Sequence, residues 1–170
     1  MERAAAELVA LLAEGSFRDA LSILQKVLSV SSNKKIDISE VETVSGAPRG
    51  ELVRQLLTAL ANKDAGAALG VMQVAVAENM DARTLAKLLI HRLRVILLTR
   101  YAPDLATTLG EEFTEADRAL VLELSKSAHV NSDTLRLVLE AYSRMAYAAL
   151  PHLPLELAIM DIAAPAKQST

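Results

Sequence analysis

The chain has 170 residues, of which 52% are hydrophobic and only 3% aromatic, and its net charge is −3. This length suits one well-buried domain, or one small domain joined to a medium one, and the acidic balance argues against a dedicated surface for nucleic acid or acidic lipid. The absence of cysteine excludes disulfides, thiolate zinc sites and cysteine nucleophiles. The most apolar stretch, residues 85–98, contains three cationic residues and a histidine, so it cannot span a bilayer and we expect a cytoplasmic protein.

Apolar periodicity predicts two helices at the N-terminus, over residues 2–13 and 17–28. Gly15 suits the end of the first helix, and the spacing of Ser16 and Asp19 is typical of a capping box that opens the second. The side chains expected to face the core of this small unit from the second helix are Phe17, Leu21, Leu24 and Leu28.

One arginine, Arg18, lies in the first turn of the second helix and is expected on its polar face. A cation at the positive end of a helix dipole costs about 0.3–1 kcal/mol. The same position, beside exposed backbone N–H groups, suits a bound anion such as a phosphate. The competing interpretation is an ordinary solvated arginine on a polar helix face.

A short third helix is expected to follow, with a capping box made by Ser39 and Glu42. Ser45–Pro48 then forms the only candidate domain boundary that we find in the sequence. Beyond it the periodicity predicts about six more helices, and no alternating strand pattern of useful length occurs. Their expected positions are about 52–62, 64–76, 81–101, 114–128, 133–149 and 155–163.

The motifs of common catalytic and metal sites are missing from the sequence. There is no phosphate-binding G-x-x-x-x-G-K-[ST] loop, no G-x-S-x-G and no H-E-x-x-H. The three histidines, His91, His129 and His152, are far apart and have no partner at ligand spacing. We therefore expect no catalysis and no metal site from this chain by itself. The helix over 81–101 is apolar on more than one face, which predicts either a central core helix or one shared with a neighbouring subunit.

Residues 14–25 read EGSFRDALSILQ, which resembles the sensor-2 segment of the AAA+ lid in clamp loaders, EGSxRDALSLxDQ in the bacterial form. Residues 35–46 resemble the third helix of that lid, although Val44-Ser45-Gly46 stands where the family has Leu-Gly, and Gln25-Lys26 replaces Asp-Gln. Past the boundary, the chain is similar to the oligomerisation domain of the bacterial DNA polymerase III gamma/tau family. The similar segments are Gly66–Leu69, Leu88–Tyr101, Leu135–Leu150 and Pro154–Ala158.

The resemblance implies an all-α fold with a three-helix AAA+ lid over residues 1–47, a helical collar that joins subunits over 48–164, and a disordered tail over 165–170. It implies that Arg18 senses nucleotide by contacting the γ-phosphate of ATP, with Gly15, Ser16 and Asp19 as the supporting motif. No cofactor is expected in this segment alone, whereas ATP and magnesium would bind the complete parent protein.

The implied partners are other clamp-loader subunits of the gamma/tau, delta and delta-prime types. The sliding clamp and primed DNA would be reached only through the full assembly. Two alternatives stay open. One is a segment of a delta-prime-type subunit, which shares the fold but does not use ATP. The other is a free-standing helical adaptor that only looks like an AAA+ lid. A phosphate loop and an arginine finger encoded upstream would favour the gamma/tau interpretation.

Overall fold

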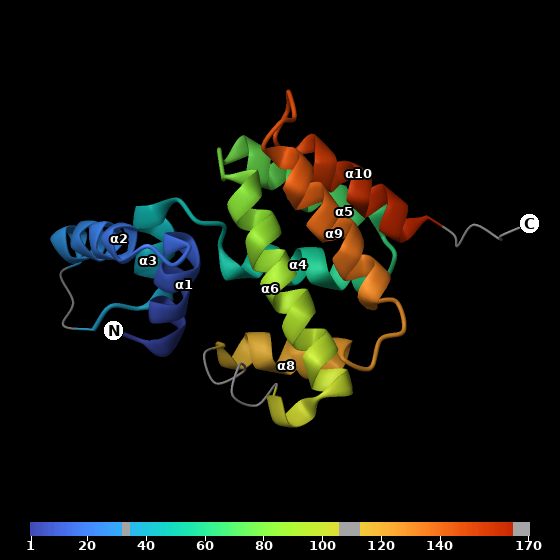
Figure 1. Ribbon diagram of the computed structural model, residues 1–170, viewed down its shortest axis with the longest axis horizontal. Helices are drawn as coiled ribbons and strands as arrows, with labels where there is room; N and C mark the ends of the chain where they lie inside the picture. The colour runs from blue at the N-terminus through green and yellow to red at the C-terminus, as the bar shows by residue number, and fades with distance from the viewer. Residues whose placement is uncertain (32–34, 106–112, 165–170) are drawn as a thin grey trace, which may run out of the picture.

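The structure, a computed structural model, describes residues 1–31, 35–105 and 113–164, and within these ranges it is helical without any strand (Figure 1). The predicted all-α class is confirmed. The predicted disordered tail over 165–170 lies outside the described residues. The helices are α1 (Arg3–Ala13), α2 (Phe17–Val30), α3 (Ile38–Ser45), α4 (Gly50–Ala61), α5 (Ala65–Ala77), α6 (Ala82–Tyr101), α8 (Glu115–Leu124), α9 (Ser132–Met145) and α10 (Leu153–Ala163).

The first three helices pack against one another at one end of the molecule (Figure 1). Ala5 of α1, Val27 of α2 and Val41 of α3 are each fully buried where these helices meet. The turn from α1 to α2 is tight because Glu14 and Gly15 both adopt left-handed backbone conformations, with φ of 51° and 82°. A left-handed conformation strains most side chains and suits glycine.

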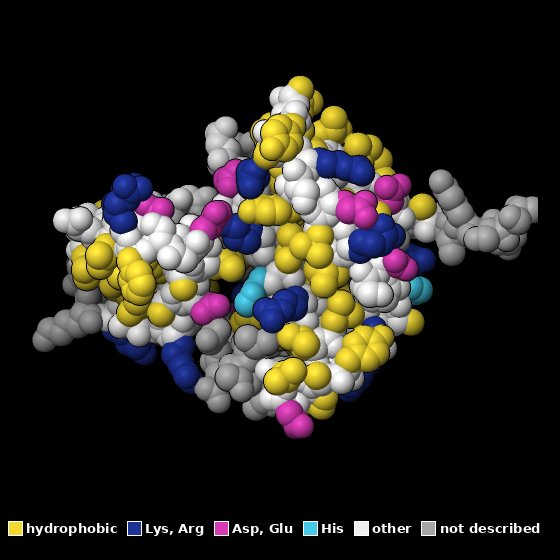
Figure 2. Space-filling view, viewed as in Figure 1, with side chains coloured by type: hydrophobic (Ala, Val, Ile, Leu, Met, Phe, Trp, Pro, Cys, Tyr) yellow, Lys and Arg dark blue, Asp and Glu magenta, His cyan; other side chains and the backbone are white. Residues whose placement is uncertain are grey.

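The predicted apolar stripe of α2 does not face the core. The side chains of Phe17, Leu21 and Leu28 are 88%, 64% and 63% exposed. Figure 2 shows hydrophobic side chains gathered over α2, at the left of the view. The prediction was wrong because α1 and α3 contact only the side of α2 that carries Val27, with Leu24 partly buried beside it. The apolar arc of α2 is wider than the surface that two short helices can cover.

The cap of α3 also differs from the prediction. The N-cap is Asp37 rather than Ser39, and Asp37 forms a reciprocal capping box with Glu40. The Ser39 hydroxyl donates to the Asp37 carboxylate at 2.7 Å and is therefore engaged as a donor. Glu42 instead accepts a hydrogen bond from the Gly50 N–H, the first residue of α4, at 2.8 Å.

The remaining helices are arranged around α6, which runs through the middle of this larger group (Figure 1). Its side chains Leu85, Leu89, Leu93 and Ile96 are fully buried. Helices α4, α8 and α9 pack directly on α6, and α10 packs on α9, α5 and α4. Of the two predictions for this apolar helix, the central position is the one that the structure shows. The predicted starts of α5, α6 and α8 are confirmed, with Asp64, Asp81 and Thr114 as their N-caps, and Asn131 caps α9.

Several helix boundaries differ from the predicted ones by two to four residues. Helix α8 ends at Leu124 and α9 at Met145, each about one turn earlier than the periodicity predicts. Helix α10 begins at Leu153, so Pro154 lies in its first turn instead of preceding it. Proline is tolerated there because the first N–H groups of a helix have no intrahelical acceptor.

The two groups of helices meet at the junction that contains Gly46 and Pro48. Gly46 ends α3 with φ of 68°, and Lys87 of α6 forms an ion pair with Glu14 at the end of α1. Buried side chains from α1–α3 and from the later helices belong to one connected hydrophobic cluster. The division into domains at 1–47 and 48–164 stays a prediction.

Candidate functional site at the start of helix α2

The start of α2 is fixed by Ser16, which adopts an extended backbone as the N-cap. Its hydroxyl oxygen accepts a hydrogen bond from the Asp19 N–H at 3.3 Å. Unlike α3 and α9, α2 shows no reciprocal capping bond within the part of the chain that the structure describes. The Asp19 carboxylate lies 3.6 Å from the Arg18 Nε instead. The predicted capping residues are therefore in place, but only one half of the box is formed.

Arg18 projects from this helix start into solvent, with a side chain that is 90% exposed. Its ion pair with Asp19 is long and solvated, and pairs of this kind contribute about 0–1 kcal/mol. The guanidinium can therefore leave Asp19 at little cost. Arg18 is thus a cation at the positive end of a helix dipole, held by weak contacts and available to an approaching anion.

The surroundings of Arg18 combine charge with exposed apolar surface. Phe17 and Leu21 are large exposed hydrophobic side chains in the same first turns of α2. Exposed apolar patches on soluble proteins commonly mark surfaces that another domain or protein covers. A partner with an anionic group beside an apolar surface would match both features. The structure thus brings Gly15, Ser16, Arg18 and Asp19 together at one exposed corner, as the sequence predicts, and adds the apolar stripe that the sequence assigns to the core.

A buried ionic cluster in the later helices was not predicted. Asp117, near the start of α8, is almost fully buried and receives hydrogen bonds from Arg54 at 3.2 Å and Arg92 at 3.0 Å. The Arg92 guanidinium also stacks over the Phe113 ring, 3.8 Å from its centroid. Burial lowers the pKa of Arg92, and the nearby Asp117 carboxylate opposes that effect. The sequence places Arg92 among the inward-facing leucines of α6. A buried arginine requires a carboxylate nearby, so this position is the signal from which the cluster could have been predicted.

This ionic cluster stabilises the packing of three helices and offers little to a substrate. Asp117 uses both carboxylate oxygens on the two arginines, and it accepts a further hydrogen bond from the Thr114 hydroxyl at 2.7 Å. The carboxylate thus accepts three hydrogen bonds from within the protein, which fits a structural role.

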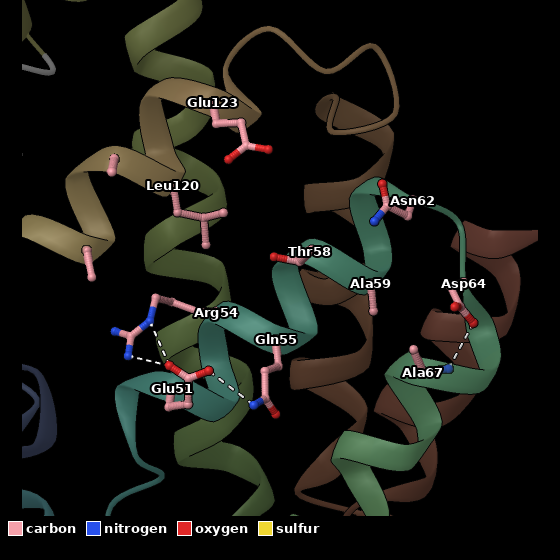
Figure 3. A pocket seen from close by; sticks show the side chains of 12 residues that line it. Glu51, Arg54, Gln55, Thr58, Ala59, Asn62, Asp64, Ala67, Leu120 and Glu123 are labelled. Carbon is pink, nitrogen blue, oxygen red and sulfur yellow. Dashed lines mark hydrogen bonds and ion pairs between the residues drawn. The ribbon is translucent and has the colours of Figure 1, made fainter.

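A groove of about 520 Å³ lies between α4, α8 and the start of α5 (Figure 3). Alanine side chains make up much of its lining. At one end, Glu51 accepts hydrogen bonds from Arg54 and Gln55, and these bonds lower the pKa of Glu51. Asp64 caps α5 at the other end. Glu51 and Asp64 are thus engaged in side-chain pairing and helix capping, while Thr58, Asn62 and Glu123 also line the groove.

Two further properties of the described residues bear on metal and membrane binding. No group of three or more His, Cys, Asp or Glu side chains in these ranges is arranged to hold a metal ion. No helix in the same ranges is long and apolar enough to cross a membrane.

These observations describe an all-α protein with an exposed arginine at a helix start, beside exposed apolar side chains. No protein-family model matches the chain. Over 99% of its length it is similar to part of DNA polymerase III subunit tau from Bacillus subtilis (strain 168), with 27% identity over 174 residues. The chain spans about 30% of the length of that protein. The similarity is distant, and it relates this chain to one section of a DNA polymerase III subunit.

Proposed function

We propose that this chain is the AAA+ lid and collar section of a gamma/tau-type clamp-loader subunit of DNA polymerase III. The distant similarity to subunit tau extends over nearly the whole chain, which favours a related arrangement of both sections. The motif at residues 14–21 supports the lid assignment independently, because Gly15, Ser16 and Arg18 occupy an exposed helix start suited to anion contact.

In the proposed subunit, Arg18 contacts the γ-phosphate of ATP bound to a preceding nucleotide-binding domain. The observation that carries this role is the nearly complete exposure of the Arg18 side chain, together with its long, solvated ion pair with Asp19. The exposed stripe of Phe17, Leu21 and Leu28 would then pack against the same domain. Binding of ATP would close the lid on that domain, because the guanidinium and the apolar stripe bind it together.

The later helices would form the collar that joins this subunit to others of the gamma/tau, delta and delta-prime types. Closing such a ring with ATP and magnesium would open the sliding clamp and place it on primed DNA. The chain itself would supply the sensing arginine and the subunit contacts, while the catalytic groups for hydrolysis would belong to the nucleotide-binding domain.

The proposal is tested with Arg18→Ala in the complete subunit, assembled with its partner subunits, ATP, magnesium, sliding clamp and primed DNA. We expect clamp loading to fall by about 10²-fold or more, which is the size of effect seen when one charge-stabilising donor is removed. The melting temperature should stay almost unchanged, because Arg18 makes no buried contact. Lys26→Ala, which removes an exposed cation of α2 away from the helix start, is the matched control and should load clamps normally.

Three outcomes would contradict the proposal. Unaltered loading and ATPase rates for Arg18→Ala would remove the sensor role. A complete subunit that binds no ATP would favour the delta-prime-type alternative, and one that joins no loader subunit would favour the free-standing adaptor.

A further inference from the structure

The contact between α1–α3 and the later helices is small. Among the described helices, the pairs that pack extensively on each other all lie within one of these two groups. Between the groups, a cavity of about 30 Å³ is lined by side chains of both, including Leu8 of α1 and Val53 and Leu88 of the later helices. The relative placement of two packed units is fixed firmly only where their interface is large. Here it depends on the few specific contacts that cross the junction.

One of these contacts involves the turn that carries Arg18. Glu14, which ends α1, forms an ion pair with Lys87 of α6, the helix in the middle of the later group (Figure 1). The Lys87 side chain is only 19% exposed, so most of it is packed while its ammonium group reaches the carboxylate. The hydrogen bond from Lys87, and then its charge, lower the pKa of Glu14.

The local structure of α1 does not favour a glutamate at this position. Glu14 has a left-handed backbone with φ of 51°, a conformation that favours glycine or asparagine at the end of a helix. Its negative charge also lies at the negative end of the α1 dipole. The ion pair with Lys87 offsets both effects, which indicates that the Glu14 side chain serves a contact outside its own helix.

Two other charged side chains act on Glu14. Arg83, one turn earlier than the lysine on α6, attracts the carboxylate, and α9 holds its guanidinium in place. It donates to the Tyr142 hydroxyl at 3.4 Å and lies 4.9 Å from the centroid of that ring. Asp19 repels Glu14 and lies beside Arg18. Glu14 therefore joins cations of the later helices to the corner that displays Arg18.

The chain between Glu14 and Arg18 is too constrained to absorb a movement. Gly15 is also left-handed, with φ of 82°. The Ser16 N–H donates to the carbonyl oxygen of Ala13 at 2.8 Å, and Ser16 is the N-cap of α2. A shift of Glu14 relative to α6 is therefore passed on to the first turn of α2.

We propose that the Glu14–Lys87 ion pair positions Arg18 by setting how α1–α3 lie on α6. Lys87 is then a positioning residue, which acts through Arg18 and touches no nucleotide. This inference rests on the proposed sensing role of Arg18. It adds a contact within one chain, between the two groups of helices.

The first experiment measures the placement of α1–α3 in the 170-residue chain. Because the chain has no cysteine, spin labels at Gln25→Cys on α2 and Gln73→Cys on α5, both exposed, report one distance between the two groups. Double electron–electron resonance should give one narrow distribution for the parent. Lys87→Met keeps the length of the side chain without its charge, and it should raise the share of displaced distances by about two- to fivefold. Lys87→Arg, which keeps the charge, should restore the narrow distribution.

The second experiment measures clamp loading by the complete subunit, assembled with its partner subunits, ATP, magnesium, sliding clamp and primed DNA. Lys87→Met should lower loading by about three- to tenfold, because a small misplacement of a functional group is costly. Arg18→Ala combined with Lys87→Met should load no more slowly than Arg18→Ala alone, because Lys87 acts through Arg18. Lys35→Met breaks the exposed Lys35–Glu2 ion pair inside α1–α3. It is the matched control and should change neither the loading nor the distance.

Glu14→Gly separates positioning from charge. It removes the ion pair and gives the left-handed position the residue that this conformation favours, so the melting temperature should stay close to that of the parent. Lys87→Met makes the corner around Arg18 more negative, whereas Glu14→Gly makes it less negative. Positioning predicts slower loading for both variants. A purely electrostatic effect on ATP predicts changes in opposite directions.

Three results would overturn the proposal. An unchanged distance distribution for Lys87→Met would show that the ion pair does not set the placement of α1–α3. Opposite changes in loading for Glu14→Gly and Lys87→Met would leave an electrostatic effect alone. Additive losses in the double variant would show that Lys87 acts independently of Arg18. Normal loading by Arg18→Ala would instead remove the sensing role, and the distance measurement would still decide whether the ion pair sets the placement.

Discussion

The first three helices and the later ones use their hydrophobic residues differently. Helix α6 buries four large side chains completely and has α4, α8 and α9 packed around it. Helix α2 buries only Val27 completely, while Phe17, Leu21 and Leu28 remain exposed. The difference shows that the later helices form a core largely by themselves, whereas α1–α3 display apolar surface that suits an additional contact. Four comparisons test this contrast, from the largest expected effect to the smallest.

Asp117 and Asp19 offer a matched pair of carboxylates in the first turns of α8 and α2. Each follows a capping hydroxyl by three residues and lies beside arginine, but Asp117 is buried and Asp19 is exposed. Asp117→Asn leaves Arg54 and Arg92 without their shared countercharge, and breaking a buried ion pair costs about 3–5 kcal/mol. Asp19→Asn removes only a solvated pair and should cost less than about 1 kcal/mol.

Urea unfolding of the two variants measures this difference in the free energy of unfolding. Equal losses for Asp117→Asn and Asp19→Asn would mean that the start of α2 is as firmly packed as the start of α8. That result would contradict the contrast between the two groups of helices.

Leu89 and Leu21 provide the second comparison, at matched leucines of α6 and α2. Leu89→Ala removes a fully buried side chain and should destabilise the chain by about 2–5 kcal/mol. Leu21→Ala removes an exposed one and should change the free energy of unfolding by less than about 0.5 kcal/mol. Thermal and urea unfolding check both values. A loss above 1 kcal/mol for Leu21→Ala would show that the chain itself covers the stripe of α2.

The sequence predicted the helices well, because capping residues and apolar periodicity are local signals. Asp64, Asp81 and Thr114 each begin a helix where the sequence predicts one. The start of α3 was misplaced because two capping patterns overlap there and differ by only two residues.

The burial of α2 could not be predicted in the same way. Periodicity shows that Phe17, Leu21 and Leu28 share a face, but whether a neighbour covers that face depends on tertiary packing. The ionic cluster at Asp117 was missed for a related reason. Its two arginines are 63 and 25 residues away in the sequence, so only the fold brings them together. The position of Arg18 on an open surface was predicted, because a polar helix face is a local property.

Arg100 provides the third comparison, at the C-terminal end of α8. Its guanidinium donates to the carbonyl oxygens of Leu124, Ser125 and Ser127, at and just after the end of α8. Arg100→Gln should destabilise the chain by about 1–2 kcal/mol, because hydrogen bonds from a charged donor are lost. The loss should concentrate at the end of α8, where amide hydrogen exchange should accelerate. Arg136→Gln, at an exposed arginine of α9 paired only with side chains of its own helix, is the control and should change stability by less than 0.5 kcal/mol.

Glu42 provides the fourth and smallest effect, at the junction between the two groups of helices. Burial raises the pKa of Glu42 above its ordinary value of 4.5, against the opposing effects of the Gly50 N–H and Arg54. A raised pKa means that the folded state binds the proton more tightly, so stability falls as pH rises from about 4.5 through the raised pKa. Glu42→Gln keeps an acceptor for the Gly50 N–H without the charge. The variant should therefore gain melting temperature relative to the parent at neutral pH, and the gain should disappear in acid.

Glu51→Gln is the control for this titration, because hydrogen bonding from Arg54 lowers the pKa of Glu51. Ionisation of Glu51 therefore stabilises the folded chain, whereas ionisation of Glu42 destabilises it. This stabilisation is present above the ordinary pKa of Glu51 and is lost as pH falls. Glu51→Gln should therefore be less stable than the parent at neutral pH but not in acid. If Glu42→Gln instead followed the pattern of Glu51→Gln, the charged form of the Glu42 carboxylate would stabilise the folded chain. The junction between α3 and α4 would then depend on an ionic contact, as the packing around Asp117 does. In that case the contact between α1–α3 and the later helices would be stronger than the exposed side chains of α2 indicate.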